Sequence, residues 1–291
     1  MSPECTVKDG VFGISPEVSL MPIRFLNSNG NGDLATAVRA IDYAIAQHVD
    51  VLSASWGAHL SASEATPLIE AIQRANLAGI GFVAAAGNNS ESNDDYDTFP
   101  ANVNLPNVIS VTSTGQQDER SIWANFGIRS VHIAAPGHDI LSTLPGGAYG
   151  LLSGTSMAAP LVAGLVAFLK AQDPALTGAQ ARALLQVTGE KALVINACHC
   201  RIDALAAVNA LLSRKLFIFP ASAYLKLGET QQFRGHFGRA PYKFTLSNSS
   251  LGTISEAGLF QAVQAGTTTV TVADRDGNQA TSFNVDVLPT D

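Results

Sequence analysis

Short apolar runs alternate with longer segments of mixed polarity through the first two thirds of the chain. In the longer segments, apolar residues recur every three or four positions, which is the spacing of an amphipathic helix. The short runs are bounded by turn residues and indicate buried strands at residues 18–25, 49–55, 80–86, 108–112 and 131–135. Buried strands that alternate with helices are typical of an α/β fold, so we predict a doubly wound, mostly parallel sheet with helices on both faces.

Capping residues mark where several of the helices begin. Asp33 can cap the helix that follows it, and Ser61 with Glu64 has the spacing of a capping box. The helix after Ser61 is expected to stop at Gly79, because glycine commonly follows the last helical residue. Further helices are predicted at residues 161–170, 178–187 and 202–212.

The pattern of apolar and polar residues changes after residue 212. From residue 217 onward helical periodicity is absent, and short runs rich in Val, Thr and Phe alternate with Gly and Asn turns. This pattern is typical of a small antiparallel β-sandwich. We therefore predict two domains, an α/β domain at residues 1–213 and an all-β domain at residues 214–291.

Composition and charge indicate a globular protein. Of the 291 residues, 46% are hydrophobic and 14% are charged, which is enough for a large core. The net charge of −7 and the lack of a Lys/Arg cluster argue against a nucleic-acid partner. The longest apolar run, residues 157–169, is too short for a membrane span and contains Pro160 and Gly164. The first residues lack the basic and apolar regions of a signal peptide.

The sequence GTSMAAP at residues 154–160 sets Ser156 at the start of a long apolar helix. The N-terminus of a helix offers unpaired N–H groups and the positive end of the helix dipole, which together stabilise developing negative charge. Ser156 is therefore a candidate nucleophile. The alternative interpretation is that Thr155 or Ser156 only caps the helix.

Asn88 and residues 55–57 follow two of the predicted strands. In a parallel sheet, functional groups gather beyond the carboxyl ends of the strands, so we expect these residues to lie along one edge of the sheet. The alternative for Asn88 is an ordinary turn, in which Gly and Asn are common.

GTSMAAP and AAAGN at residues 84–88 resemble motifs of the subtilisin-like serine protease family, the subtilases. The order of the two motifs along the chain and the residues around them also resemble the family. The resemblance covers residues 10–212. Further segments similar to family landmarks are residues 13–20, 50–57, 99–101, 134–137 and 201–204. The all-β domain resembles a bacterial Ig-like domain at residues 228–230, 240–242, 258–260 and 268–272.

The resemblance implies a serine endopeptidase with a subtilisin-like fold that is incomplete at its N-terminus. Ser156 would be the nucleophile that forms the acyl-enzyme, and the Asn88 amide would hold the oxyanion together with the Ser156 N–H. It also implies a secreted protein whose extended substrate binds as an added strand. The substrate-binding residues that it implies are Ser55, Trp56, Gly57, Ala85, Ala86 and Gly87. The alternative for Trp56 is an ordinary core residue.

The catalytic Asp and His of the family are missing from this sequence. Their settings, Asp-Ser/Thr-Gly and His-Gly-Thr-His, do not occur, and none of the six histidines has the family context. We therefore expect both residues upstream of Met1, with the protein's own N-terminal segment as a partner of this chain. The 291 residues alone are expected to be inactive, because an unassisted serine hydroxyl is a weak nucleophile.

Two features leave alternatives open for metal binding and cysteine chemistry. The acidic residues 91–97 could hold calcium through oxygen ligands, or form a solvated acidic loop. Cys198-His199-Cys200 could bind a metal, form a bridge within the tripeptide, or supply one cysteine that pairs with Cys5 or with a cysteine upstream. We expect a structural disulfide and assign no metal ligand.

The sequence also leaves two other functions open. The chain could be a non-catalytic relative that binds peptides, or an adhesive or spacer protein in which the Ig-like domain is the working part. The presence of both Ser156 and Asn88 favours the peptidase, because a protein that only binds peptides requires neither. Proteins or peptides are the expected substrates.

Overall fold

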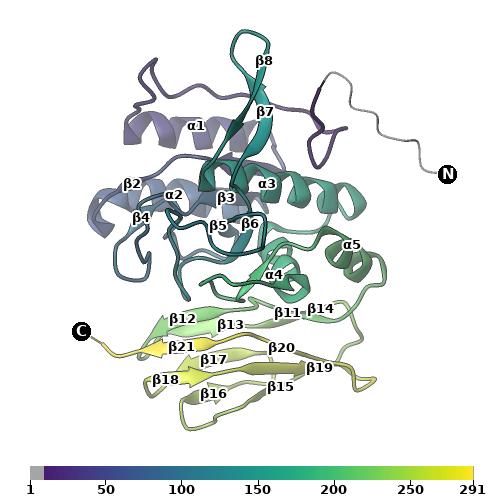
Figure 1. Ribbon diagram of the computed structural model, residues 1–291. Helices are drawn as coiled ribbons and strands as arrows, with labels where there is room; N and C mark the ends of the chain where they lie inside the picture. The colour runs from purple at the N-terminus through teal and green to yellow at the C-terminus, as the bar shows by residue number, and fades with distance from the viewer. Residues whose placement is uncertain (1–9, 291) are drawn as a thin grey trace, which may run out of the picture.

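The computed structural model describes residues 10–290. Its first part contains a six-stranded sheet in the order β1-β3-β5-β6-β10-β9 (Figure 1). Neighbouring strands from β1 to β10 are parallel, and β9 is antiparallel to β10. The predicted mostly parallel sheet is therefore confirmed. The bounds are Val51–Ala54 for β1, Gly81–Ala85 for β3, Val108–Thr114 for β5, Ile133–Pro136 for β6, Glu190–Lys191 for β9 and Cys200–Arg201 for β10.

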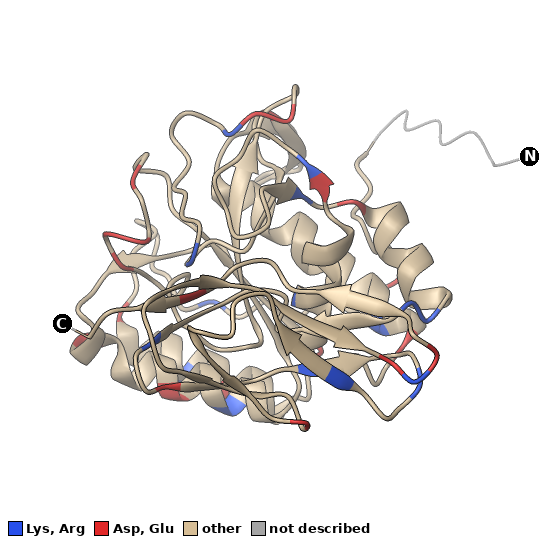
Figure 2. Ribbon diagram, turned by 90° about the horizontal axis from the view of Figure 1, so that it is seen from below, with Lys and Arg blue, Asp and Glu red and all other residues tan. Residues whose placement is uncertain are grey.

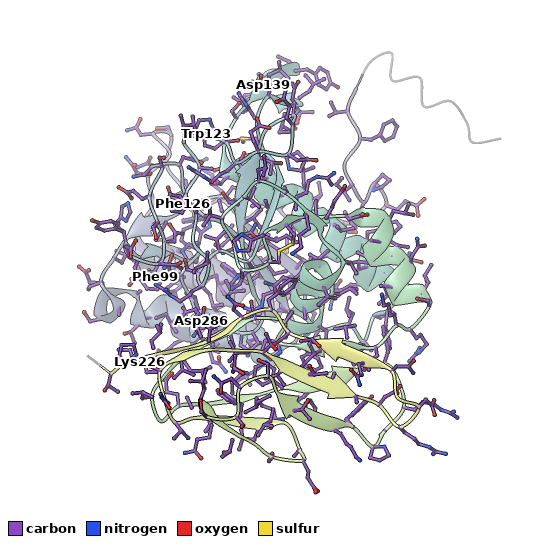
Figure 3. The ribbon with its side chains drawn as sticks, turned by 60° about the horizontal axis from the view of Figure 1, so that its bottom comes forward. Phe99, Trp123, Phe126, Asp139, Lys226 and Asp286 are labelled. Atoms are coloured by element: carbon purple, nitrogen blue, oxygen red, sulfur yellow. A yellow bond between two sulfur atoms is a disulfide. The ribbon has the colours of Figure 1, made fainter. Side chains whose placement is uncertain are left out.

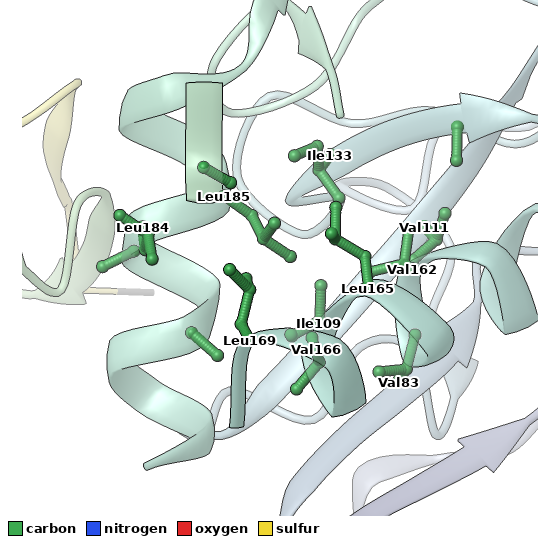
Figure 4. Packing of buried hydrophobic residues seen from close by; sticks show 14 of the residues in the cluster. Val83, Ile109, Val111, Ile133, Val162, Leu165, Val166, Leu169, Leu184 and Leu185 are labelled. Atoms are coloured by element: carbon green, nitrogen blue, oxygen red, sulfur yellow. The ribbon is translucent and has the colours of Figure 1, made fainter. Parts of the chain in front are cut away.

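Helices cover both faces of this sheet. Successive residues of each strand point to opposite faces, so the sheet contributes to two core clusters. In β3, Val83 and Ala85 belong to one core cluster, whereas Phe82 and Ala84 belong to another. The first cluster packs against α3, α4 and α5, and the second packs against α1 and α2. Figure 4 shows the first cluster between the strands, α3 and α4. The helix bounds are Leu34–Ala46 for α1, Ala62–Leu77 for α2, Thr155–Gln172 for α3, Gly178–Thr188 for α4 and Ala204–Leu212 for α5.

The predicted starts of α1 and α2 are confirmed. Asp33 accepts a hydrogen bond from the Thr36 N–H at 2.8 Å. Ser61 and Glu64 form both hydrogen bonds of a capping box. These bonds satisfy N–H groups that have no acceptor inside the helix, which is why short local patterns predicted the two helix starts.

The predicted strand at residues 18–25 is wrong, since this segment lies in no helix or strand. An apolar run becomes a strand only where a neighbouring strand supplies hydrogen bonds. Among the described residues, β1 ends the sheet and pairs only with β3, and Leu20 stays 88% exposed. Pro22 also removes one backbone donor from the run.

The second part of the chain is all-β, as predicted. Its strands form small sheets around a core of their own, in which Phe233, Phe260, Val270 and Val285 are buried. The strand bounds are Phe217–Phe219 for β11, Ala223–Lys226 for β12, Thr230–Gln232 for β13, Arg234–His236 for β14, Lys243–Leu246 for β15, Gly252–Ile254 for β16, Leu259–Ala262 for β17, Gly266–Thr268 for β18, Val270–Ala273 for β19, Gln279–Thr281 for β20 and Val285–Leu288 for β21.

Two small ribbons complete the α/β part. One pairs β2 (Ala58–His59) with β4 (Thr98–Phe99). The other is the hairpin of β7 (Ile140–Leu144) and β8 (Ala148–Leu152), which ends just before α3 and projects from the body in Figure 1.

Besides its own core, the all-β part contributes residues to the first core cluster of the α/β part. Phe217 on β11 is 2% exposed and belongs to the same core cluster as Leu184 of α4. His236 Nδ1 lies 3.0 Å from Gln180 Nε2 of α4. Burial at this interface is the main reason why the pKa of His236 is lowered. The all-β part therefore packs directly on α4 of the α/β part, as Figure 1 also shows.

The cysteines of the tripeptide form a disulfide with each other, Cys198 to Cys200. This is one of the three alternatives that the sequence left open. Both residues are buried in the first core cluster. Cys5 lies outside the described residues.

Helix α3 has the length and hydropathy of a membrane-spanning helix. Its residues Leu165, Val166 and Leu169 are nevertheless buried against the sheet, so we interpret α3 as the central core helix. Figure 2 shows Lys and Arg dispersed among Asp and Glu over the ribbon.

Candidate active site

Ser156 is the second residue of α3, and its hydroxyl does not cap the helix. The N-cap residue is Gly154, and no side chain makes a capping hydrogen bond there. The α3 helix begins at Thr155, which confirms that Ser156 lies in its first turn, whereas the predicted range 161–170 covers only the middle of the helix. Ser156 Oγ donates to the backbone oxygen of Ser55, 3.4 Å away. The capping alternative is therefore wrong, and one long hydrogen bond holds this half-buried hydroxyl.

Ser55 compensates for the proline in the second turn of α3. Proline has no N–H, so Pro160 leaves the carbonyl of Ser156, four residues earlier, without its helical partner. Ser55 Oγ donates to that carbonyl at 2.8 Å. This exchange lets α3 continue through Pro160, and it ties the residue after β1 to the candidate nucleophile.

The start of α3 also packs closely against the loop after β6. The Gly154 N–H donates to the backbone oxygen of Gly137 at 2.8 Å. A Cβ on Gly137 would lie 2.7 Å from the oxygen of Gly154 and 2.5 Å from Ser113 Oγ. Only glycine permits this approach, which fixes where α3 begins.

Asn88 follows β3 and reaches the start of α3. Its Oδ1 accepts a hydrogen bond from the Thr155 N–H at 2.9 Å and lies 3.0 Å from Thr155 Oγ1. Among residues 10–290 no acceptor binds its Nδ2, so this nitrogen is a donor available to another molecule. A Cβ built on Gly154 would lie 3.6 Å from that nitrogen, which therefore borders the helix start.

The backbone N–H of Ser156 is a second available donor. The first N–H groups of a helix have no acceptor inside it. Asn88 takes the Thr155 N–H, whereas the Ser156 N–H has no acceptor in the described part of the chain. The positive end of the α3 dipole adds to the field of both donors. A hydroxyl and two free donors thus lie at one helix end, where an oxyanion could be stabilised.

The six residues that were predicted to bind substrate differ in their exposure. Ser55 and Gly57 are exposed, and Gly87 is half-buried with φ +115°. Trp56 is partly buried and packs edge-on against the Phe25 ring, with centroids 5.2 Å apart. The remaining two residues are buried, Ala85 and Ala86. Their substrate-binding role stays a prediction.

None of the described histidines is bonded to Ser156. His132 is buried and accepts from the Ser110 N–H at 2.9 Å. Burial, and then the nearby Arg182 charge, keeps the pKa of His132 well below its usual range. His138 lies 3.8 Å from Asp139 on the surface. Within residues 10–290, the hydrogen bonds of Ser156 involve Ser55 and its own helix, so no general base is in place.

The acidic segment 91–97 anchors a loop. Asp94 accepts hydrogen bonds from the N–H groups of Ile128, Arg129 and Ser130, at distances of 2.8 to 3.3 Å. Because its oxygens are used in this way, they are poorly placed as calcium ligands. The described residues contain no group of three or more His, Cys, Asp or Glu residues that fits a metal ion. The structure thus gives Asp94 a structural role, and calcium binding by residues 91–97 stays a prediction.

Sequence reasoning missed three polar residues that build this region. Thr155 Oγ1 accepts from the Gly87 N–H at 3.1 Å. Asn93 and Asn125 are each 1% exposed and bind one another behind Asn88. The apolar neighbours Ala124 and Phe126 are a sequence signal for the burial of Asn125 but not for its hydrogen-bond partners. Figure 3 labels Phe126, its neighbour in sequence, in the α/β part.

Comparison with known protein families gives two matches along the chain. The sequence profile of the Subtilase family matches residues 4–208. The profile of the bacterial Ig-like domain, group 2, matches residues 217–285. The interval between the two matches contains the boundary that we predict after residue 213.

Individual relatives agree with the first match. The chain is 37% identical over 161 residues to subtilisin-like protease 2 of Plasmodium falciparum, covering 55% of this chain and 12% of that protein. It is 37% identical over 180 residues to subtilisin amylosacchariticus of Bacillus subtilis subsp. amylosacchariticus, covering 62% of this chain and 46% of that protein. The chain thus spans less than half the length of these relatives.

Solved structures give a similar result. A protease from Pseudoalteromonas arctica aligns with a TM-score of 0.63 and 30% identity, covering 69% of this chain and 66% of that one. A cold-adapted subtilisin-like serine proteinase aligns with a TM-score of 0.57 and 31% identity, covering 67% of this chain and 70% of that one.

Proposed function

The chain belongs to the subtilase family of serine endopeptidases, and from this premise we propose that the whole protein hydrolyses peptide bonds through an acyl-enzyme on Ser156. One observation carries the proposal. The Ser156 hydroxyl is free of any capping role, and two unpaired donors, its own N–H and Asn88 Nδ2, lie at the same helix end.

The proposed reaction begins with attack of Ser156 Oγ on the substrate carbonyl. The hydroxyl proton passes to a general base, and the carbonyl oxygen becomes an oxyanion that accepts from the Ser156 N–H and from Asn88 Nδ2. Collapse of the intermediate breaks the C–N bond, and the protonated base returns its proton to the leaving amine. Water then hydrolyses the ester and regenerates Ser156. Thr155 binds the Asn88 oxygen and so orients the amide, which leaves Nδ2 as the free donor.

The proposed substrates are proteins, bound in an extended conformation. Two stretches at the carboxyl ends of β1 and β3 would pair with the substrate backbone, residues 55–57 and 85–87. All residues of the two stretches except Trp56 are glycine or carry small side chains, which supports this because small residues allow a close approach of two backbones. Secretion of the protein, which the family resemblance implies, is part of the same proposal.

We also propose that the 291 residues alone are inactive. Ser156 has no histidine or carboxylate partner among residues 10–290, and a serine hydroxyl without a base is a weak nucleophile. The peptidase proposal therefore concerns the whole protein, which must include a general base.

A fluorophosphonate probe tests the nucleophile in the whole protein. The probe should label Ser156, as read by mass spectrometry of the labelled peptide, and Ser156→Ala should abolish labelling. Ser153→Ala is the matched control, because Ser153 is an exposed serine nearby that bonds Asp139. Labelling at another serine would refute the assignment. Peptide binding without labelling or hydrolysis would indicate the non-catalytic relative.

Asn88→Ala tests the oxyanion role. We expect kcat to fall on the order of a hundred- to a thousand-fold, a magnitude established for the corresponding asparagine of subtilisin itself. KM should change little, because the amide acts mainly in the transition state. An unchanged kcat would remove Asn88 from the mechanism.

A further inference from the structure

We propose that Asn125 is a positioning residue, whose buried side chain holds residues 87–91 in the shape that presents Asn88 to the oxyanion. This inference rests on the function proposed above. Asn125 belongs to the segment between β5 and β6, far from Asn88 in sequence, and is 1% exposed. Its contacts with the loop surround Asn88 on both sides.

Both backbone neighbours of Asn88 are bound to Asn125. The Asn125 N–H donates to the oxygen of Gly87 at 2.9 Å. The Asn125 side-chain oxygen accepts from the N–H of Asn89 at 2.8 Å and from that of Glu91 at 3.3 Å. These bonds leave the Asn88 backbone little freedom to rotate, while its side chain is free to reach α3.

A second buried amide extends this support to the end of β3. Asn125 Nδ2 donates to Asn93 Oδ1 at 2.9 Å, and Asn93 Nδ2 donates to the oxygen of Ala86 at 2.9 Å. Asn93 is also 1% exposed. The two amides thus connect residues before and after Asn88 through a chain of hydrogen bonds that water does not reach. A buried network of this kind is rigid when every member is satisfied.

The chain passes over Asn125 only because residue 87 is glycine. Gly87 has φ +115°, which side chains rarely adopt, and a Cβ there would lie 2.5 Å from Asn125 Nδ2. The close approach and the hydrogen bonds therefore act together on the same loop. Asn88 is consequently fixed from two sides, because Asn125 binds the backbone of its neighbours Gly87 and Asn89 and Thr155 binds the Asn88 side chain.

The chemistry of this position calls for a carboxamide. One atom must accept two N–H groups, and the other must donate to the Asn93 oxygen. In Asn125→Asp the donor becomes a second acceptor that faces an oxygen, so the contact with Asn93 turns repulsive. The loop is then expected to shift, and Asn88 with it.

A double-mutant cycle in the whole protein tests the proposal. Asn125→Asp should lower kcat on the order of ten- to a hundredfold with KM nearly unchanged, because a small misplacement of a catalytic group is costly. In the Asn88→Ala background, the same change should lower kcat less than about threefold, because the group that it positions is already gone.

Asn107→Asp is the matched control. Asn107 is equally buried, at 1% exposure, and its Nδ2 donates to the Ile80 oxygen at the opposite end of β3. This change perturbs the same strand without touching the loop, so it should leave kcat within about threefold of the parent when the protein is folded. A loss of kcat equal to that of Asn125→Asp would overturn the positioning role.

The outcomes separate this inference from the proposed function. No effect of Asn88→Ala on kcat refutes the oxyanion assignment. A clear effect of Asn88→Ala, combined with equal losses from Asn125→Asp in both backgrounds, refutes only the positioning role. If Asn125→Asp does not fold, Asn125→Ser removes the amide without adding charge, and the same comparison between the two backgrounds decides.

Discussion

Truncation of Phe217 tests whether the two parts of the protein unfold as one unit. Phe217 lies at the start of the Ig-like match, but its side chain is 2% exposed within the core cluster of the α/β part. Its ring packs against three others, with centroid distances of 5.0 Å to His236, 5.9 Å to Phe237 and 6.5 Å to Phe219. Phe217→Ala would remove these contacts and leave a cavity.

The expected cost is large. Replacing a fully buried phenylalanine by alanine lowers the free energy of unfolding by about 3–5 kcal/mol. If the two parts unfold together, an unfolding entropy of about 2.1 cal/mol/K per residue amounts to about 0.6 kcal/mol/K for the 291-residue chain. Phe217→Ala should then lower the common Tm by about 5–8 °C.

Differential scanning calorimetry provides the assay, with Phe260→Ala as the matched control. Phe260 is completely buried, but in the separate core of the all-β part. Cooperative unfolding predicts one transition that both variants shift. The reasoning is refuted if two transitions appear and Phe217→Ala moves only the one that Phe260→Ala also moves.

Two further predictions concern stability. Gly178→Ala should lower Tm, because a Cβ at residue 178 would lie 2.6 Å from the Gly81 Cα. Gly164→Ala is the control, because its Cβ would meet only the exposed residue Ile14, and it should lower Tm less. Thermal melts that give both variants the same Tm would contradict this prediction. The free energy of unfolding should fall as pH drops below about 6.5, because burial and then Arg182 lower the pKa of His132 in the folded state, so the unfolded state binds the proton first. Urea titrations at pH 7 and 5 should show a smaller fall for His132→Gln, and an equal fall would exclude His132 as a cause.

The local sequence was sufficient to predict most of the sheet and several helix starts. Apolar runs predicted β1, β3, β5 and β6, because strands that are covered on both faces are rich in apolar residues along their length. Asp33 and Ser61 predicted two helix starts, because a cap involves residues only three apart. The run at residues 18–25 failed for the opposite reason, since a strand also needs a partner that its own sequence does not specify.

Sequence motifs were sufficient to indicate the candidate residues Ser156 and Asn88, but not the contacts between residues that are far apart in the chain. GTSMAAP and the asparagine after β3 indicated Ser156 and Asn88, and hydrogen bonds through Thr155 join the two segments. The support from Asn125 could not be predicted, because it depends on side-chain hydrogen bonds between segments far apart in the chain. The same is true of Ser55, whose bond to the α3 carbonyl matters only because Pro160 leaves that carbonyl free.

The shared core at Phe217 also bears on how such a protein could arise by joining ready-made modules. The profiles of the two families leave only residues 209–216 between them, yet Phe217 and Phe237 pack among residues of the α/β part. A different Ig-like module transplanted at this junction would bring the wrong side chains against α4. The α/β part and the all-β part are therefore expected to have coevolved after they were joined, so that related proteins should conserve or replace the residues at this contact together.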